Sequence, residues 1–133
     1  MNKIILLAVI LLSGCTLVDS YLMTKYDANE YLLITQIRVS AQRFQKQCDD
    51  AMSSTGNAHA INSLTELFAS YTEQLPHNKE EAQAAKALNE IAQGLWERYS
   101  KRETVSTTFC QIKFQNIEHS AQLIQSVSAK RPR

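Results

Sequence analysis

Apolar residues recur every three or four positions along most of the chain. This spacing places them on one face of an α-helix, so the pattern predicts amphipathic helices rather than strands. Four such helices are predicted, at residues 27–52, 58–75, 79–99 and 109–127. Glycine and proline, three and two residues respectively, are too scarce for a turn-rich β-sandwich. The predicted fold is therefore all-α, a small up-down helical bundle.

Local signals set the predicted helix limits. Asp27 and Asn78 are each followed three residues later by a glutamate, Glu30 and Glu81, which is the capping-box pattern of a helix start. Residues 53–57 are Ser-Ser-Thr-Gly-Asn, a cluster typical of loops. We therefore expect a loop between the first two helices at these five positions.

Two arrangements fit the last part of the chain. Residues 104–108 are Thr-Val-Ser-Thr-Thr, and such β-branched and hydroxyl side chains favour helix poorly. The chain is therefore expected to turn near Thr104, which gives four helices. No glycine or proline lies between residues 100 and 108, so a bundle of three helices with a long last helix is the alternative.

The N-terminus has a different pattern. Lys3 precedes nine consecutive apolar residues, 4–12, as in the charged and hydrophobic regions of a secretory signal. Nine helical residues rise only about 13 Å, much less than the roughly 30 Å of a bilayer core. We expect an export signal rather than a permanent membrane span, with a buried core segment as the alternative.

Residues 12–15, Leu-Ser-Gly-Cys, stand directly behind this apolar run. They resemble the lipobox of bacterial lipoproteins, in which an aliphatic and two small residues precede an obligatory cysteine. The resemblance covers residues 1–16 and implies cleavage before Cys15, with diacylglycerol and an acyl chain attached to that cysteine and no other cofactor. Thr16, where an aspartate marks retention in the inner membrane, implies a lipid anchor in the outer membrane facing the periplasm. Two or three acyl chains give stable anchoring.

Removal of residues 1–14 from the 133-residue chain leaves 119 residues, enough for one domain. Residues 76–133 hold nine basic and six acidic side chains. This basic excess suits a solvated surface, anionic lipid or an acidic protein face, whereas a nucleic-acid partner fits an exported chain poorly. The expected parts are a signal peptide at residues 1–14, a lipid-anchored tether at 15–26, the helical bundle at 27–129 and a basic tail at 130–133.

Cys48 and Cys110 are the only other cysteines, and both lie on apolar stripes. An exported chain with two such cysteines is expected to join them in one disulfide, with two free buried thiols as the alternative. A turn near Thr104 would bring both cysteines to the same level on adjacent antiparallel helices. An unbroken last helix would leave them about 16 Å apart along the bundle, beyond the roughly 7 Å that a disulfide allows between Cα atoms.

Motifs for catalysis are absent from the sequence: it contains no Gly-x-Ser-x-Gly, phosphate-binding glycine loop or His-Glu-x-x-His. His59, His77 and His119 have no second histidine or cysteine at helical spacing, so no metal site is expected. We therefore expect no enzyme, no catalytic residue and no metal. The neighbouring Asp49 and Asp50, expected at a helix C-terminus, are a weak candidate for surface contact, and ordinary solvation is the competing interpretation.

Exposed tyrosine, tryptophan and arginine side chains often anchor protein interfaces. The candidate partner-binding residues are aromatic side chains outside the predicted stripes and basic side chains near the predicted turn: Tyr21, Tyr26, Trp96, Arg98, Lys101 and Arg102.

The leading functional hypothesis is an outer-membrane-anchored periplasmic lipoprotein that binds a protein as a non-enzymatic accessory of an envelope assembly. An alternative is an exclusion or immunity lipoprotein of a phage or plasmid, which would block a receptor or an incoming machine. A third hypothesis is a small-ligand or metal carrier that uses the bundle core. The sequence does not indicate an oligomeric state.

Overall fold

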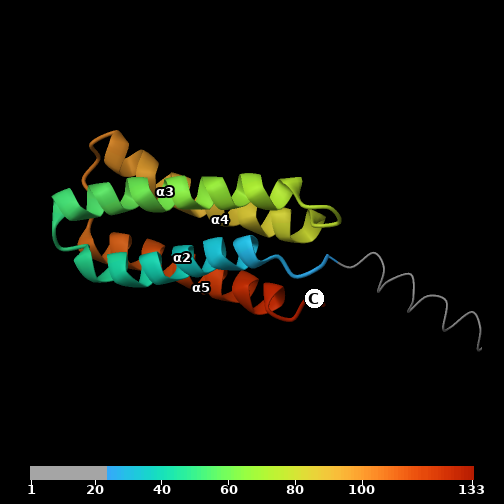
Figure 1. Cartoon of the computed structure of the whole chain (residues 1–133). Coiled ribbons are helices and arrows are strands. Elements are labelled where there is room, and N and C mark those ends of the chain that lie inside the picture. The colour runs from blue at the N-terminus through green and yellow to red at the C-terminus, as the bar shows by residue number, and fades with distance from the viewer. Residues whose placement is uncertain (1–23) are drawn as a thin grey trace, which may run out of the picture.

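Residues 24–133 are described by a computed structural model, in which four α-helices follow one another with short connections (Figure 1). A short 3-10 helix, η1 (Gln45–Gln47), extends the first of them. The described residues contain no strand, so the all-α prediction is confirmed. The α-helices are α2 (Ala28–Phe44), α3 (Ala51–Gln74), α4 (Lys79–Ser100) and α5 (Thr107–Ser128).

The helices run alternately up and down, and they pack as two close pairs. Helix α3 packs most closely on α4, and α2 packs most closely on α5. Fewer contacts join α2 to α3 and α4 to α5. The two looser seams therefore lie on opposite sides of the bundle, and each leaves apolar side chains partly exposed.

The core lies along the centre of the bundle, where each helix contributes side chains at the predicted spacing. The rings of Phe44 and Phe114 meet edge-on, with their centroids 5.7 Å apart. The largest fully buried apolar side chains are Phe68, Phe114, Ile34, Ile37, Ile61, Leu88, Leu95 and Ile117.

The chain turns between α4 and α5, which confirms the four-helix arrangement. Helix α4 ends at Ser100, and Arg102 follows with a φ of 57°, in the left-handed region that often terminates helices. The Ser106 hydroxyl then accepts a hydrogen bond from the Phe109 amide at 3.1 Å and caps α5. A hydroxyl from the run with poor helix propensity thus starts the last helix.

The predicted disulfide joins Cys48 and Cys110, whose Cα atoms lie 5.8 Å apart. Cys48 follows η1, and Cys110 lies in the first turn of α5. Both are buried, and the bond fastens adjacent antiparallel helices at the end of the bundle where α4 passes to α5.

The loop predicted at residues 53–57 is wrong, because those residues lie within α3. Asp50 is the N-cap of α3, and its carboxylate accepts hydrogen bonds from the amides of Met52 at 3.3 Å and Ser53 at 3.2 Å. Hydrogen bonds from the Ser53 hydroxyl, the Ser53 amide and the Met52 amide lower the pKa of Asp50 below its ordinary value. Asp50 thus stands at a helix N-terminus, where negative charge is favourable, and not at a C-terminus as predicted.

Candidate functional site

Both ends of the described chain meet at one end of the bundle, here called the terminal end and made of residues 24–26, the α3–α4 turn and residues 129–133. The Thr24 hydroxyl donates to the His77 carbonyl in that turn. The Tyr26 amide donates to the Pro132 carbonyl at 2.9 Å. The opposite end, called the disulfide end, consists of residues 48–50 and the turn at residues 101–106.

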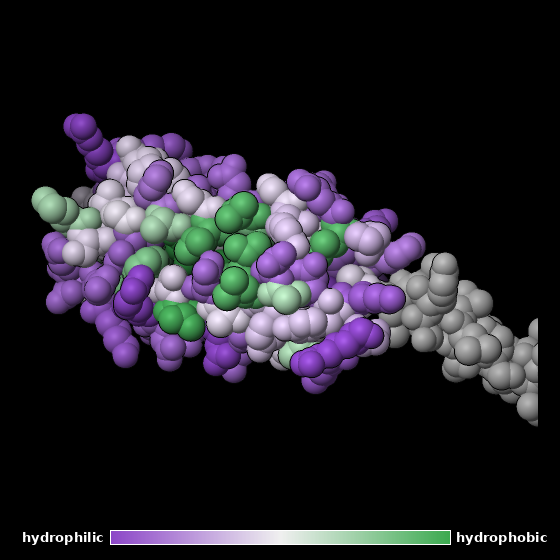
Figure 2. Space-filling model, in the orientation of Figure 1, coloured by the Kyte–Doolittle hydropathy of each residue, from purple (hydrophilic) through white to green (hydrophobic). Residues whose placement is uncertain are grey.

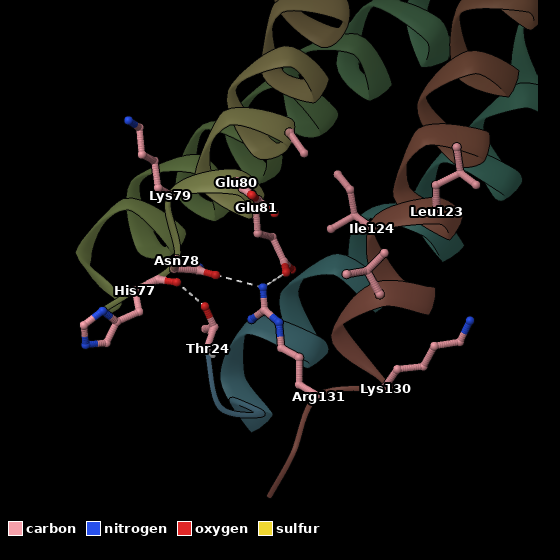
Figure 3. A pocket seen from close by; sticks show the side chains of 12 residues that line it. Thr24, His77, Asn78, Lys79, Glu80, Glu81, Leu123, Ile124, Lys130 and Arg131 are labelled. Atoms are coloured by element: carbon pink, nitrogen blue, oxygen red, sulfur yellow. Dashed lines mark hydrogen bonds and ion pairs between the residues drawn. The ribbon is translucent and has the colours of Figure 1, made fainter. Parts of the chain in front are cut away.

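A buried polar cluster around Arg131 closes the terminal end (Figure 3). The Arg131 guanidinium donates to Glu30 Oε2 at 2.6 Å and to Asn78 Oδ1 at 2.8 Å, and it forms an ion pair with Glu81. The Asn78 side chain also donates to Glu30 Oε1 at 2.7 Å. The Ser128 hydroxyl donates to the second Glu81 oxygen. Five side chains from α2, the α3–α4 turn, α4, α5 and the C-terminal segment are therefore joined in one network.

The cluster is shielded from water, since the side chains of Arg131, Glu30 and Glu81 are 9%, 0% and 4% exposed. One guanidinium faces two carboxylates in this buried site, so both carboxylates depend on it for a counter-charge. Arg131 was predicted within a basic tail, but its guanidinium lies inside the bundle end.

Of the two predicted capping boxes, one is half formed and the other is not formed. Asp27 does cap α2, with its Oδ1 accepting from the Glu30 amide at 2.8 Å. The Glu30 and Glu81 carboxylates, however, face Arg131. Asn78 stands at the N-cap position of α4 without a side-chain capping bond, because its amide is used within the cluster. The Asn78–Glu81 box and the reciprocal half of the Asp27–Glu30 box are therefore wrong predictions.

A groove of about 970 Å³ lies beside this cluster, between α4 and α5. Its apolar wall is formed by Ala84 of α4 and by Leu123, Ile124 and Val127 of α5. Figure 3 shows Leu123 and Ile124 on one side of the groove and Glu81 on the other. Charged side chains at its edge include Lys79, Glu80 and Lys130.

The groove exists because the looser α4–α5 seam combines short and long side chains. Leu123 and Val127 lie one helical turn apart on the same flank of α5, and they are 62% and 59% exposed. Ala84, across the seam, is too short to cover them. Val127 is the last residue of the helix predicted at 109–127, and the neighbouring Ser128 is buried instead.

The sequence-predicted contact residues do not form one site. Tyr26 lies half-buried at the terminal end, with the Arg133 guanidinium 5.4 Å from its ring centroid. The other described candidates lie toward the disulfide end: Trp96, Arg98, Lys101 and Arg102. Cys15 and Tyr21 fall outside the described residues.

At the disulfide end, aromatic and basic side chains contact one another. Trp96 is half-buried, and its ring lies 4.8 Å from that of His59 in an edge-on contact. The Arg98 guanidinium lies 4.3 Å from the Phe109 ring centroid. Lys101 is exposed and lies 4.0 Å from Glu97. Part of this aromatic and basic surface is thus already engaged within the domain.

Within residues 24–133, no group of three or more histidine, cysteine, aspartate or glutamate side chains is placed to hold a metal ion. No helix in the same part of the chain combines the length and apolar character needed to cross a bilayer. The groove offers apolar side chains for packing and charged side chains for ion pairing, and both kinds of interaction can bind a ligand.

Comparison with protein-family models, with curated proteins and with solved structures finds no match for this chain.

The groove residues Leu123 and Val127 were missed as a site in the sequence because the helical pattern alone does not distinguish the edge of a stripe from its centre. Arg131 had one usable signal, namely that Glu30 and Glu81 occupy stripe positions and would need a buried cation.

Proposed function

We propose that this chain is a lipid-anchored protein of the bacterial outer membrane that binds a partner protein through the groove between α4 and α5. The observation that carries the proposal is the pair of exposed apolar side chains, Leu123 and Val127, in a groove at the terminal end. Contiguous exposed apolar surface bordered by polar residues is typical of interaction sites.

Two features support the proposed location. Residues 12–15 resemble a lipobox, and acylation of Cys15 would hold the terminal end of the bundle near the membrane. The Cys48–Cys110 disulfide suits an oxidising compartment such as the periplasm, since disulfides persist there.

The shape and chemistry of the groove favour a protein segment as its ligand. An apolar helix face or an extended apolar segment could lie along Leu123 and Val127, as in helix-in-groove recognition. Lys79, Glu80 and Lys130 would then contact polar residues at the rim, where charge contributes mainly to specificity. The proposed role is a non-enzymatic accessory of an envelope assembly.

The test compares two substitutions of equally exposed valines. Val127 is 59% exposed in the groove, and Val39 is 57% exposed on the outer side of α2. The full-length variants Val127→Glu and Val39→Glu are purified by affinity from detergent-solubilised envelopes of the producing bacterium, and the co-purified proteins are quantified. We expect Val127→Glu to lower the recovery of the partner at least about fivefold, the effect of about 1 kcal/mol, and Val39→Glu to retain it. Equal recovery by both variants would contradict the proposal.

A further inference from the structure

The side of the bundle opposite the groove carries an apolar patch over α2 and α3 (Figure 2). Leu32 and Leu67 are 54% and 53% exposed there. Leu33, Ala60 and Leu64 are partly buried and pack against the core beneath them. The packing of one bundle therefore leaves part of this apolar surface exposed to solvent.

Contacts between the two helices fix the limits of this surface. At the disulfide end, the Asn57 amide donates to Gln47 Oε1 at 2.7 Å. At the terminal end, the Tyr71 hydroxyl donates to Asp27 Oδ1 at 3.0 Å. Helical spacing between these contacts defines the α2–α3 face, which consists of Asn29, Leu32, Leu33, Gln36, Ser40 and Arg43 on α2 and Asn57, Ala60, Leu64, Leu67 and Tyr71 on α3.

Among the eleven side chains of the α2–α3 face only Arg43, toward the disulfide end, is charged, although Asp, Glu, Lys and Arg make up 20% of the chain. The acidic residues of this part of α3 lie on its other flank, where Glu66 and Glu73 line a hollow toward α4. The α4–α5 groove, by contrast, has Lys79, Glu80 and Lys130 at its edge. The α2–α3 face is thus apolar and uncharged at its centre, and its one charged side chain lies toward the disulfide end.

We propose that a second copy of this chain covers the α2–α3 face, forming a symmetric pair. In a two-fold interface the same patch meets itself, so a charge near the axis would face an identical charge. The centre of the α2–α3 face, around Gln36, has no charged side chain and therefore avoids this repulsion. Depletion of charge around exposed leucines is also the composition of an interface core.

The pairing does not depend on the lipid anchor and goes beyond the proposed function. Because the α4–α5 seam lies on the opposite side of the bundle, each copy would keep its groove free. A pair would therefore present two grooves, and a bivalent partner would bind it with increased avidity.

Cysteine crosslinking of the full-length chain in membranes tests the pairing. Gln36 is exposed and lies midway along α2 between the two contacts that limit the face, so its copies would lie near the two-fold axis. Gln83 is an exposed glutamine on α4, outside the face, and serves as the matched control. Membranes holding Gln36→Cys or Gln83→Cys are treated with a flexible bismaleimide, which can react with the new thiol while Cys48 and Cys110 remain joined.

We expect Gln36→Cys to form a covalent species of twice the chain mass, and Gln83→Cys to remain at the level of the unsubstituted chain. Crosslinking of Gln36→Cys to a different protein, or no excess over the control, would overturn the pairing. Crosslinked dimers of the unsubstituted chain would indicate a free Cys15 thiol and would count against the proposed anchor. The pairing would still be tested by whether Gln36→Cys forms more crosslinked dimer than the unsubstituted chain.

A second substitution shows whether the leucines hold the pair together. Leu67→Lys, combined with Gln36→Cys, places like charges in the proposed interface and is expected to lower the crosslinked fraction at least tenfold. Ile112→Lys is the control, since Ile112 is 49% exposed on α5, outside the face. Both proteins must keep the helical circular dichroism of the parent. An equal crosslinked fraction in both variants would mean that random collisions produce the dimer, and would overturn the proposal.

Discussion

Arg131 is predicted to be the most sensitive charged position of the bundle, although it is the third-last residue of the sequence. The substitution Arg131→Met keeps a long side chain and removes the guanidinium. The carboxylates of Glu30 and Glu81, 0% and 4% exposed, would then have no counter-charge in the cluster. The ends of all four helices meet here, so the loss is expected to reduce the stability of the whole domain.

The magnitude follows from the burial of the three charges. Removing one partner of a buried ion pair costs about 3–5 kcal/mol, because the remaining charge stays buried without compensation. Domains of this size have a total stability of about 5–15 kcal/mol, and each kcal/mol shifts Tm by roughly 4 °C. We therefore expect Arg131→Met to lower Tm by roughly 12–20 °C.

Thermal and urea unfolding of the purified chain, followed by circular dichroism at 222 nm, measures the effect. Arg133→Met is the control, since Arg133 is exposed. Its guanidinium lies 5.4 Å from the Tyr26 ring centroid, a cation–π interaction of about 0.5–1 kcal/mol. Adding Glu81→Gln to Arg131→Met should restore part of the lost stability, because one uncompensated carboxylate disappears. If Arg131→Met destabilised the bundle no more than Arg133→Met, the proposed dependence of both carboxylates on Arg131 would be refuted.

Two further predictions concern the disulfide end. Replacing both Cys48 and Cys110 with alanine should lower the free energy of unfolding by about 4 kcal/mol on the chain-entropy model, because the disulfide closes a loop with a sequence separation of 62. Equal urea midpoints for this variant and the oxidised parent would contradict the prediction. Asp50→Ala should lower Tm at neutral pH, whereas Asp49→Ala, an exposed residue without a capping bond, should leave it unchanged. The folded-state pKa of Asp50 is lowered, so its stabilisation is present above the ordinary aspartate pKa and disappears as the pH falls through the lowered value. The Tm difference between the parent and Asp50→Ala should therefore shrink in strong acid, and a difference that did not change with pH would contradict the capping role of the ionised carboxylate.

The helical pattern predicted the fold class, the turn before α5 and the disulfide because each follows from local chemistry. The run of β-branched and hydroxyl residues at 104–108 disfavours continued helix, and Ser106 within it supplies the cap. Placement of both cysteines at the same level then requires the turn. In this region, local propensity and the distance constraint of a disulfide lead to the same arrangement.

The sequence pattern mispredicts the start of α3 because residues 53–57 are small and polar, a composition typical of loops. Ser54 and Thr55 donate their hydroxyls to the carbonyls of Asp50 and Ala51, one turn back in the chain. These bonds occupy polar groups that would otherwise compete with the helix. The side-chain cap at Asp50 starts the helix at Ala51, five residues before Gly56, which lies inside α3. Capping by one aspartate thus outweighed the poor propensity of the residues that follow.

The Arg131 cluster and the groove required the tertiary structure. Glu30 was interpreted from its place three residues after Asp27, but its position on the buried stripe with Ile34 and Ile37 determines its environment. Its partner, Arg131, lies 101 residues away in sequence, and no local pattern reports such a contact. Likewise, the exposure of Val127 depends on the loose packing of α5 on α4.

The central claim is that this chain is a lipid-anchored protein exported to an oxidising compartment. Its most direct test is the intact mass of the chain extracted from bacterial membranes, together with peptide mapping under non-reducing conditions. The account predicts a chain that begins at Cys15, carries diacylglycerol and an acyl chain on that residue, and yields a crosslinked Cys48–Cys110 peptide. A chain that retains residues 1–14, with an unmodified Cys15 and free thiols at Cys48 and Cys110, would contradict it.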